Sequence, residues 1–136
     1  MALFHFAFNV TDLDTTRAFY SGLLGCDEGR STESWVDFEF FGHQLSCHLG
    51  TPFVSAPTGK VGEHKVPMPH FGAVLLMPDW RALADRLAAA GVDFILAPQI
   101  RFEGQPGEQA TMFFTDPSGN PIEIKGMADL SAAFDT

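Results

Sequence analysis

Two strand-then-helix patterns organise the chain, one in each half. Apolar runs of strand length at 4–10 and 71–77 are each followed by a stretch whose apolar positions recur with helical spacing. Gly25 and Gly91 end these stretches and supply helix stops. The apolar positions of the two predicted helices are Leu13, Ala18, Phe19, Leu23 and Leu24 in the first, and Leu83, Leu87 and Ala90 in the second.

The two patterns are an internal repeat. A His-Phe pair opens each predicted strand, and the two histidines, His5 and His70, are 65 residues apart (70 − 5). After the first helix, SWVDFEFFGHQLSCHL predicts two alternating strands; after the second, DFILAP, ATMFFTDP and PIEIK predict further strands, with DPSGN as a turn. The repeat therefore predicts two similar modules, each running strand, helix and then more strands.

The segment between the modules, GTPFVSAPTGKVGEHKVPMP, is rich in proline and glycine and has no periodicity. It predicts either a plain linker or a lid over a site. We expect one domain over 1–136, with module one at 1–50, the linker or lid at 51–69, module two at 70–126 and a tail at 127–136.

Composition narrows the class of protein. The chain has 136 residues, 46% hydrophobic with 14 phenylalanines, which is enough for the core of one domain. A formal net charge of −9 disfavours nucleic acid and anionic membrane surfaces as partners. No signal peptide or spanning segment is evident, and Cys26 and Cys47 form neither a CxxC motif nor a disulfide framework. These features predict a cytoplasmic protein with reduced thiols.

Strand alternation assigns three chemistry-bearing side chains to one kind of face. In FHFAFNV, His5 points away from the phenylalanines, which must pack under the helix; in PIEIK, Glu123 points away from its two isoleucine neighbours. His70 opens the repeat of the His5 strand and inherits its facing. Two histidines and one carboxylate on concave faces form a ligand set for a divalent metal that leaves coordination positions open.

The sequence resembles the vicinal oxygen chelate superfamily, which includes glyoxalase I, fosfomycin and bleomycin resistance proteins and extradiol dioxygenases. The resemblance extends from His5 to Lys125 and is carried by FHFAFNVTDLDTTRAFYSGLLGC, HFGAVL and FFTDPSGNPIEIK. It is strongest to bacterial proteins labelled predicted extradiol dioxygenases.

The resemblance implies an α+β fold of two βαβββ modules, each a curved mixed half-barrel around a metal. It also implies a small-molecule substrate and a homodimer with shared sites, in which His5 of one chain joins His70 and Glu123 of the other.

A fourth inner position falls in HQLSCHL, where Gln44, Ser46 and His48 share one face. Either Ser46 or His48 is the residue equivalent to Glu123, and the sequence leaves the choice open. His48 is chemically the better candidate, as a fourth ligand or as an acid–base group.

These residues predict a metal-dependent enzyme that binds vicinal oxygens of its substrate, most like an extradiol dioxygenase. That class uses two histidines and one glutamate around Fe(II) with a further catalytic histidine, which matches His5, His70, Glu123 and His48. It also places a tyrosine near the metal, whereas Tyr20, the only tyrosine, lies in the first helix. Fe(II) is the favoured metal, with Mn, Ni or Zn as alternatives.

The sequence leaves two alternative functions open. A glyoxalase-like isomerase or lyase usually has Glu or Gln at the first-half position, where this chain has His48 or Ser46. A metal-free, resistance-type binding protein would lack the ligand set. Arg101, Phe113 and Trp35 are the predicted substrate contacts, Arg101 through bidentate hydrogen bonds to a carboxylate.

Overall fold

Each half of the chain folds as a helix laid against a four-stranded sheet, in a computed structural model that describes residues 1–135. One unit, module one, contains 1–54 together with 116–120; the other, module two, contains 55–115 and the chain from Pro121 onward. The predicted α+β architecture of two modules is confirmed. None of the helices within the described residues is long and apolar enough to cross a membrane.

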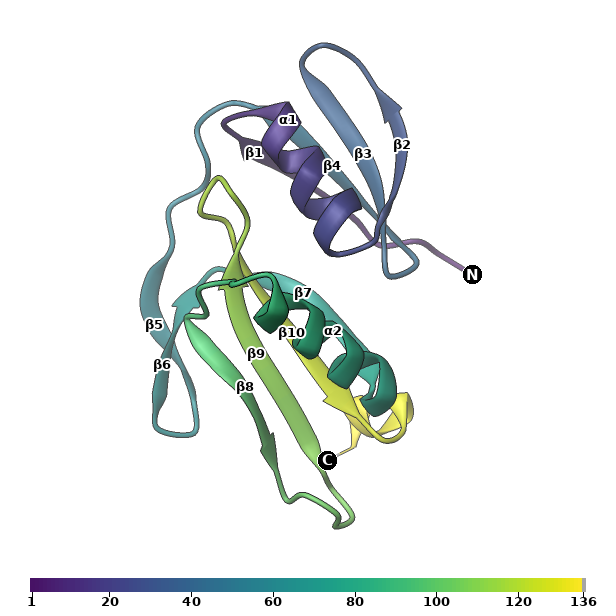
Figure 1. Cartoon of the computed structure of the whole chain (residues 1–136), viewed down its shortest axis with the longest axis vertical. Helices are drawn as coiled ribbons and strands as arrows, with labels where there is room; N and C mark the ends of the chain where they lie inside the picture. The colour runs from purple at the N-terminus through teal and green to yellow at the C-terminus, as the bar shows by residue number, and fades with distance from the viewer. Residues whose placement is uncertain (136) are drawn as a thin grey trace. The chain divides into compact units, whose positions relative to one another are not determined.

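Module one has the strand order β1-β4-β3-β2, in which β1 and β4 are parallel and the other pairs are antiparallel (Figure 1). Its elements are β1 (His5–Val10), α1 (Leu13–Arg17), the π-helix η1 (Ala18–Leu23), β2 (Asp27–Ser31), β3 (Trp35–Phe40) and β4 (His43–Leu49).

The helix of module one begins where the sequence supplies a cap. The Asp12 carboxylate accepts a hydrogen bond from the Thr15 backbone N–H at 2.8 Å, which lowers the pKa of that carboxyl. The helix widens into π-helical turns from Ala18, and Gly25 then adopts a left-handed φ of 77°.

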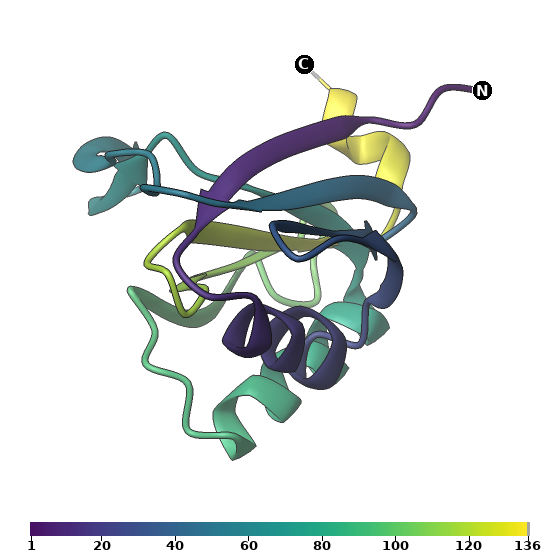
Figure 2. The same ribbon diagram turned by 90° about the horizontal axis from the view of Figure 1, so that it is seen from above.

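The core of module one lies between this helix and one face of the sheet (Figure 2). The alternation predicted for β1 is present, because Phe8 and Val10 are buried whereas His5, Ala7 and Asn9 lie on the opposite, polar face. Tyr20 is completely buried on the helix side of the sheet. The polar face of the sheet is therefore the one that carries His5.

Module two has the strand order β7-β10-β9-β8, with β7 and β10 parallel. Its elements are β5 (Ala56–Val61), β6 (His64–Met68), β7 (Phe71–Leu76), α2 (Met77–Ala89), β8 (Leu96–Arg101), β9 (Gln109–Thr115), β10 (Pro121–Met127) and the 3₁₀-helix η2 (Leu130–Phe134).

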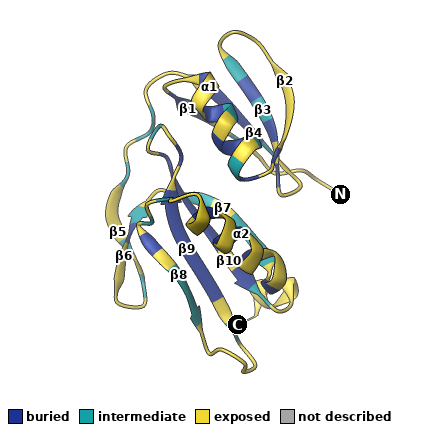
Figure 3. Cartoon of the chain, viewed as in Figure 1, coloured by how far each residue is buried: buried dark blue, intermediate teal, exposed yellow. Residues whose placement is uncertain are grey.

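The central strands of module two are its most buried elements, while α2 is exposed on its outer side (Figure 3). Ile122 and Ile124 are completely buried. The Trp80 indole N–H of α2 donates to the Ile124 carbonyl at 2.9 Å and ties the helix to β10. Glu123 thus points away from the helix, as alternation predicts, and pairs with Gly72, where any Cβ would overlap the Glu123 carbonyl oxygen.

The segment between the predicted modules is a β-hairpin rather than a plain linker. Strands β5 and β6 pair antiparallel, and Val66 of β6 is buried. Val66 packs against Leu96 and Phe113 of the neighbouring sheet, with Val61 beside it. The hairpin is therefore part of module two and covers one end of its sheet.

The turn 116–120 between β9 and β10 belongs to module one and is organised by one carboxylate. Asp116 accepts from the backbone N–H groups of Ser118 and Asn120, from the Asn120 amide and from the Tyr20 hydroxyl, each at 2.9 Å. Burial, reinforced by Asp116, raises the pKa of the Tyr20 phenol well above its usual value. The only tyrosine in the sequence is thus a core hydrogen-bond donor of module one.

We predict that the native protein shows no tyrosinate absorbance about one pH unit above 10.0, the usual phenol value. The pKa of Tyr20 is higher in the folded protein than in the unfolded chain. Stabilisation by Tyr20 is therefore complete below the unfolded pKa, and it is lost as the pH rises from that value through the folded pKa. An alkaline absorbance titration, with and without denaturant, measures this directly because no other tyrosine contributes.

The variant Tyr20→Phe is the control for that titration. It removes the tyrosinate signal from both states and leaves Asp116 with three donors, lowering the free energy of unfolding by about 2 kcal/mol. Tyrosinate appearing in the still-folded wild type at its ordinary pKa would show that the phenol is not held as described.

Candidate metal centre

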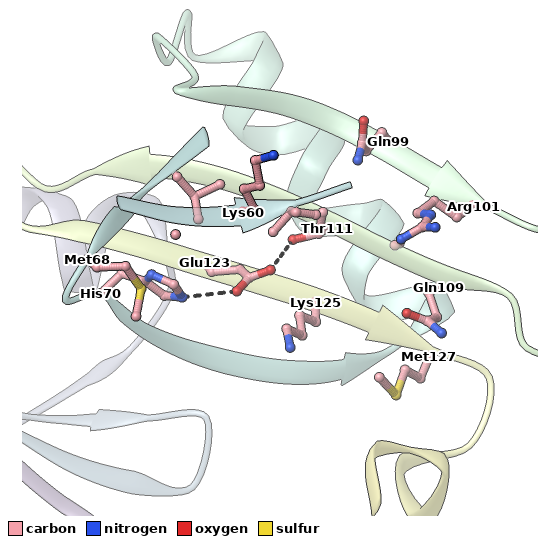
Figure 4. Close-up of a pocket in the computed structure, with 14 residues that line it drawn as sticks. Lys60, Met68, His70, Gln99, Arg101, Gln109, Thr111, Glu123, Lys125 and Met127 are labelled. Atoms are coloured by element: carbon pink, nitrogen blue, oxygen red, sulfur yellow. Dashed lines mark hydrogen bonds and ion pairs between the residues drawn. The ribbon is translucent and has the colours of Figure 1, made fainter. Parts of the chain in front are cut away.

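His70 and Glu123 lie together on the sheet of module two. His70 stands immediately before β7, and Glu123 lies on the adjacent parallel strand β10. The His70 Nε2 atom is 3.2 Å from Glu123 Oε1 (Figure 4). Glu123 is buried and His70 is partly buried, so a small part of the imidazole reaches solvent.

The hydrogen bonds of His70 fix which ring nitrogen is available. Its Nδ1 lies 2.7 Å from the Pro67 carbonyl oxygen, which can only accept, so Nδ1 carries the proton. In the neutral ring, Nε2 then presents a lone pair to the Glu123 carboxylate, which is also an acceptor. Two acceptors 3.2 Å apart require a proton or a cation between them. Neutral imidazole with an Nδ1–H bound to a carbonyl is the usual state of a metal-binding histidine.

Neighbouring side chains hold the pair in place. The Thr111 hydroxyl donates to Glu123 Oε2 at 2.6 Å, which leaves Oε1 facing His70. The ring of Phe113 meets the His70 ring edge-on, with centroids 4.9 Å apart. Phe113, predicted as a substrate contact, is completely buried and supports His70 from within the core.

His5 has the same hydrogen-bond arrangement within module one. Its Nδ1 lies 2.8 Å from the Gln44 side-chain oxygen, which accepts and leaves Nε2 as the free nitrogen. Gln44 lies directly opposite His5 on the parallel strand β4. Both histidines of the predicted ligand set are therefore oriented through Nδ1 by an oxygen atom.

Strand register identifies the module-one residue equivalent to Glu123. Ala7, two residues after His5, pairs with Ser46; Gly72, two residues after His70, pairs with Glu123. Ser46 therefore takes the equivalent position, and His48 does not. Ser46 is buried and its hydroxyl donates to Asp37 Oδ1 at 2.6 Å.

His48 lies one step further along the same face of β4. It is exposed, and its ring stacks on Trp35 at a centroid distance of 6.0 Å. This pairing places two predicted residues, His48 and Trp35, side by side in module one. An acid–base role for His48 remains a prediction, while the register excludes it from the position equivalent to Glu123.

A cavity of about 350 Å³ opens beside the His70–Glu123 pair, entirely within module two. The hairpin β5–β6 forms one wall, and the polar face of the sheet forms the floor (Figure 4). Arg101, predicted as a substrate contact, lines it. Lining residues that the sequence reasoning missed are Lys60, Gln99, Gln109, Thr111 and Lys125. Because side chains alternate along a strand, Lys125 faces the same side of the sheet as Glu123 and could have been identified from the sequence. Lys60 could not, because the sequence did not predict the hairpin that carries it.

The donor set fits a divalent metal. Within residues 1–135, no three His, Cys, Asp or Glu side chains form one metal-binding group. Module two nevertheless supplies an imidazole nitrogen and a carboxylate oxygen that face each other at 3.2 Å, and in module one the His5 Nε2 has no hydrogen bond among the described contacts. Imidazole and carboxylate ligands suit Fe, Mn, Ni and Zn.

Comparison with solved structures supports the same fold. A glyoxalase/bleomycin resistance protein/dioxygenase from Alicyclobacillus acidocaldarius is 30% identical over 98% of this chain and 96% of its own, with a TM-score of 0.74. A fosfomycin resistance protein from Listeria monocytogenes (18% identity, 93% of both chains, TM-score 0.67) and a lactoylglutathione lyase from Agrobacterium tumefaciens (16%, 93% of this chain and 94% of that one, 0.64) share the fold.

The family model that matches the sequence covers almost the whole of both modules, including the strands that carry His5, His70 and Glu123. Members of this superfamily generally use divalent metals, bind small molecules and often form dimers. With the match extending over residues 2–124, the chain belongs to the Glyoxalase/Bleomycin resistance protein/Dioxygenase superfamily.

Proposed function

We propose that the protein is a divalent-metal-dependent enzyme that binds vicinal oxygens of a small substrate, with chemistry most like that of an extradiol dioxygenase. The observation that carries the proposal is the His70–Glu123 pair, two acceptors held face to face by Pro67 and Thr111. Such an arrangement is stable with a proton or a metal ion between the two side chains. His5, held in the same tautomer, is the proposed third ligand.

His5, His70 and Glu123 would hold a divalent metal, with Fe(II) favoured by the dioxygenase-like chemistry and Mn, Ni or Zn as alternatives. A metal bound by two histidines and one carboxylate supplies Lewis acidity and open coordination positions. Thr111 fixes the carboxylate, and Pro67 and Gln44 fix the imidazoles, so the ligands are oriented before metal arrives. His48, exposed on the polar face of module one, is the proposed group that moves a proton during the reaction.

The residue at the position equivalent to Glu123 favours dioxygenase-like chemistry over glyoxalase-like chemistry. Ser46 occupies that position, and its hydroxyl is engaged by Asp37. A hydroxyl offers a weaker metal ligand than the Glu or Gln that glyoxalase-like members usually place there. The proposed ligand set thus stays at two histidines and one carboxylate, with more than one position open for substrate or dioxygen.

Metal binding is the first test of this proposal. We expect untagged wild-type protein to bind Fe(II), with Mn(II), Ni(II) and Zn(II) as alternatives, at one ion per site. We expect His70→Ala or Glu123→Gln to lose that binding. Calorimetry and elemental analysis measure both. Thr111→Val, which keeps the shape but removes the donor to Glu123, should weaken affinity about 10- to 100-fold.

His64→Ala is the matched control for the ligand variants. His64 lies in β6, is exposed and lines no part of the cavity wall described above, so its removal should leave metal affinity unchanged. Equal affinity in His64→Ala and His70→Ala, or no stoichiometric metal in the wild type, would support a metal-free small-molecule binding protein instead.

The second test separates the two chemistries. We expect Fe(II)-loaded protein to consume oxygen with catechols and to leave a glutathione hemithioacetal unchanged. We expect His48→Gln, which keeps a polar side chain but no titratable group, to lower kcat about 10²- to 10⁴-fold while metal content stays constant. Oxygen uptake and ultraviolet absorbance follow the two reactions. Isomerisation of the hemithioacetal without oxygen uptake would assign the protein to the glyoxalase-like class.

We further propose a homodimer in which His5 of one protomer completes the metal site on His70 and Glu123 of its partner. Module two supplies two ligands, so the third has to come from outside that module. Dimers are common in this superfamily. A shared site makes metal binding depend on association.

Mixing two inactive variants tests the shared site. His5→Ala and His70→Ala each abolish every site in their own homodimers. A mixed dimer regains one intact site, because His5 comes from one chain and His70 with Glu123 from the other. We therefore expect unfolding and refolding of an equimolar mixture to restore about one quarter of wild-type metal binding by random pairing. A mixture that binds no metal would show that each site is built within one chain.

A further inference from the structure

We infer that the cavity beside His70 and Glu123 binds a small anionic compound, one whose carboxylate, phosphate or phosphonate group is held by Lys125, with Arg101 further along for a longer molecule. This inference rests on the proposed function, since it treats the cavity as the substrate site of that metal centre. It adds the charge of the substrate and the residues that recognise it.

The basic residues of the chain are concentrated around this cavity. The whole sequence has eight lysines and arginines against seventeen acidic residues. Three of those eight, Lys60, Arg101 and Lys125, line a single cavity of about 350 Å³. Glu123 is the only carboxylate among the described lining residues, and it is occupied by His70 and Thr111. The lining is thus positively charged in a protein whose net charge is −9.

The lysines of the cavity have no carboxylate partner. Within residues 1–135, none of the described ion pairs involves Lys60 or Lys125. Lys60 pairs with Lys65 on the face of the hairpin opposite to Val61 and Val66, which pack on the sheet, so its side chain points away from the cavity floor. Lys125 shares the face of Glu123, and an anion in the cavity would give it a partner.

Strand register sets the distance between the metal pair and the cationic groups. Lys125 lies two residues after Glu123 on β10 and on the same face, a spacing of about 7 Å along the strand. Thr111 and Gln99 continue that row across β9 and β8. The next row holds Gln109 and Arg101, about 14 Å from Glu123.

Figure 4 shows Lys125, Gln109 and Arg101 following one another along the sheet away from Glu123, with Lys60 on the hairpin above. A compact substrate would thus place two oxygens at the metal and its acid group about 7 Å away, beside Lys125. Gln99 and Thr111 can donate hydrogen bonds to the same group. Arg101 would be reached only by a longer molecule.

Binding of phenylphosphonate, measured by calorimetry at fixed ionic strength, tests the inference. We expect the metal-free wild type to bind it at least about tenfold more tightly than its neutral dimethyl ester, since a charge-assisted hydrogen bond contributes roughly that factor. Lys125→Met should weaken binding about tenfold. Lys60→Met and Lys65→Met each remove the same charge from the outer face of the hairpin and should change affinity less than about twofold.

Two results would overturn the inference. Equal affinity for the ester and the phosphonate would show that the cavity does not recognise the negative charge of the ligand. An equal effect of Lys65→Met and Lys125→Met would show only general attraction to positive charge. Light scattering supplies a third result that would overturn it. If Lys125→Met dissociates the protein but leaves phosphonate affinity unchanged, Lys125 serves association between copies of the chain.

Glu123→Gln separates failure of this inference from failure of the proposed function. The variant should lose metal and retain phosphonate, because it removes a negative charge near the lysines without altering them. Wild-type protein that binds metal but binds the phosphonate and its neutral ester equally would overturn the inference of an anionic substrate. The proposal of a metal-dependent enzyme would be unaffected. Protein that binds the phosphonate but no metal would support the anion site and contradict the proposed metal-dependent function.

Discussion

The carbonyl oxygen of Pro67 decides which nitrogen of His70 is free. It accepts from Nδ1, and Nε2 is thereby turned toward a carboxylate that has nothing to donate. Thr111 removes the other possibility, that Glu123 rotates away, by holding its second oxygen. The candidate centre is thus defined by two hydrogen bonds to the outer atoms of His70 and Glu123, and these bonds fix the orientation of both side chains.

The Pro67 carbonyl is itself positioned by packing. Its neighbour Val66 is buried against Leu96 and Phe113, and Phe113 also meets the edge of the His70 ring. One apolar cluster therefore places the hairpin, the acceptor for Nδ1 and the imidazole together. The same hairpin carries Lys60 to the cavity wall. The orientation of His70 consequently depends on a hairpin that is held to the sheet by Val66, with Val61 beside it.

Alternation along single strands was sufficient to predict the facing of His5 and Glu123, because each lies between apolar residues that must enter the core. The internal repeat then assigned His70 by equivalence. These inferences needed only the period of a strand and the position of a helix above it. They account for the two-module architecture and for the proposed ligand set, but for little else in the site.

Other features depend on interactions that no local pattern records. Strand β2 has five exposed residues and no apolar period, so only its pairing with β3 defines it. The hairpin β5–β6 has a single well-buried residue, Val66, in a segment rich in proline and glycine. The choice between Ser46 and His48 required the register of β1 against β4, which is set by tertiary pairing. Lys60 entered the cavity only once the hairpin was known.

The two modules are repeats in backbone but not in chemistry. At equivalent positions, Glu123 accepts from Thr111 and keeps one oxygen for His70, whereas Ser46 gives its only proton to Asp37. Module one therefore presents an oriented imidazole, and the carboxylate that lies beside Ser46 on the same face, Asp37, accepts the Ser46 proton. A metal held by one carboxylate instead of two retains a larger positive charge and more open positions. Both consequences favour a substrate that brings its own oxygen ligands and its own negative charge.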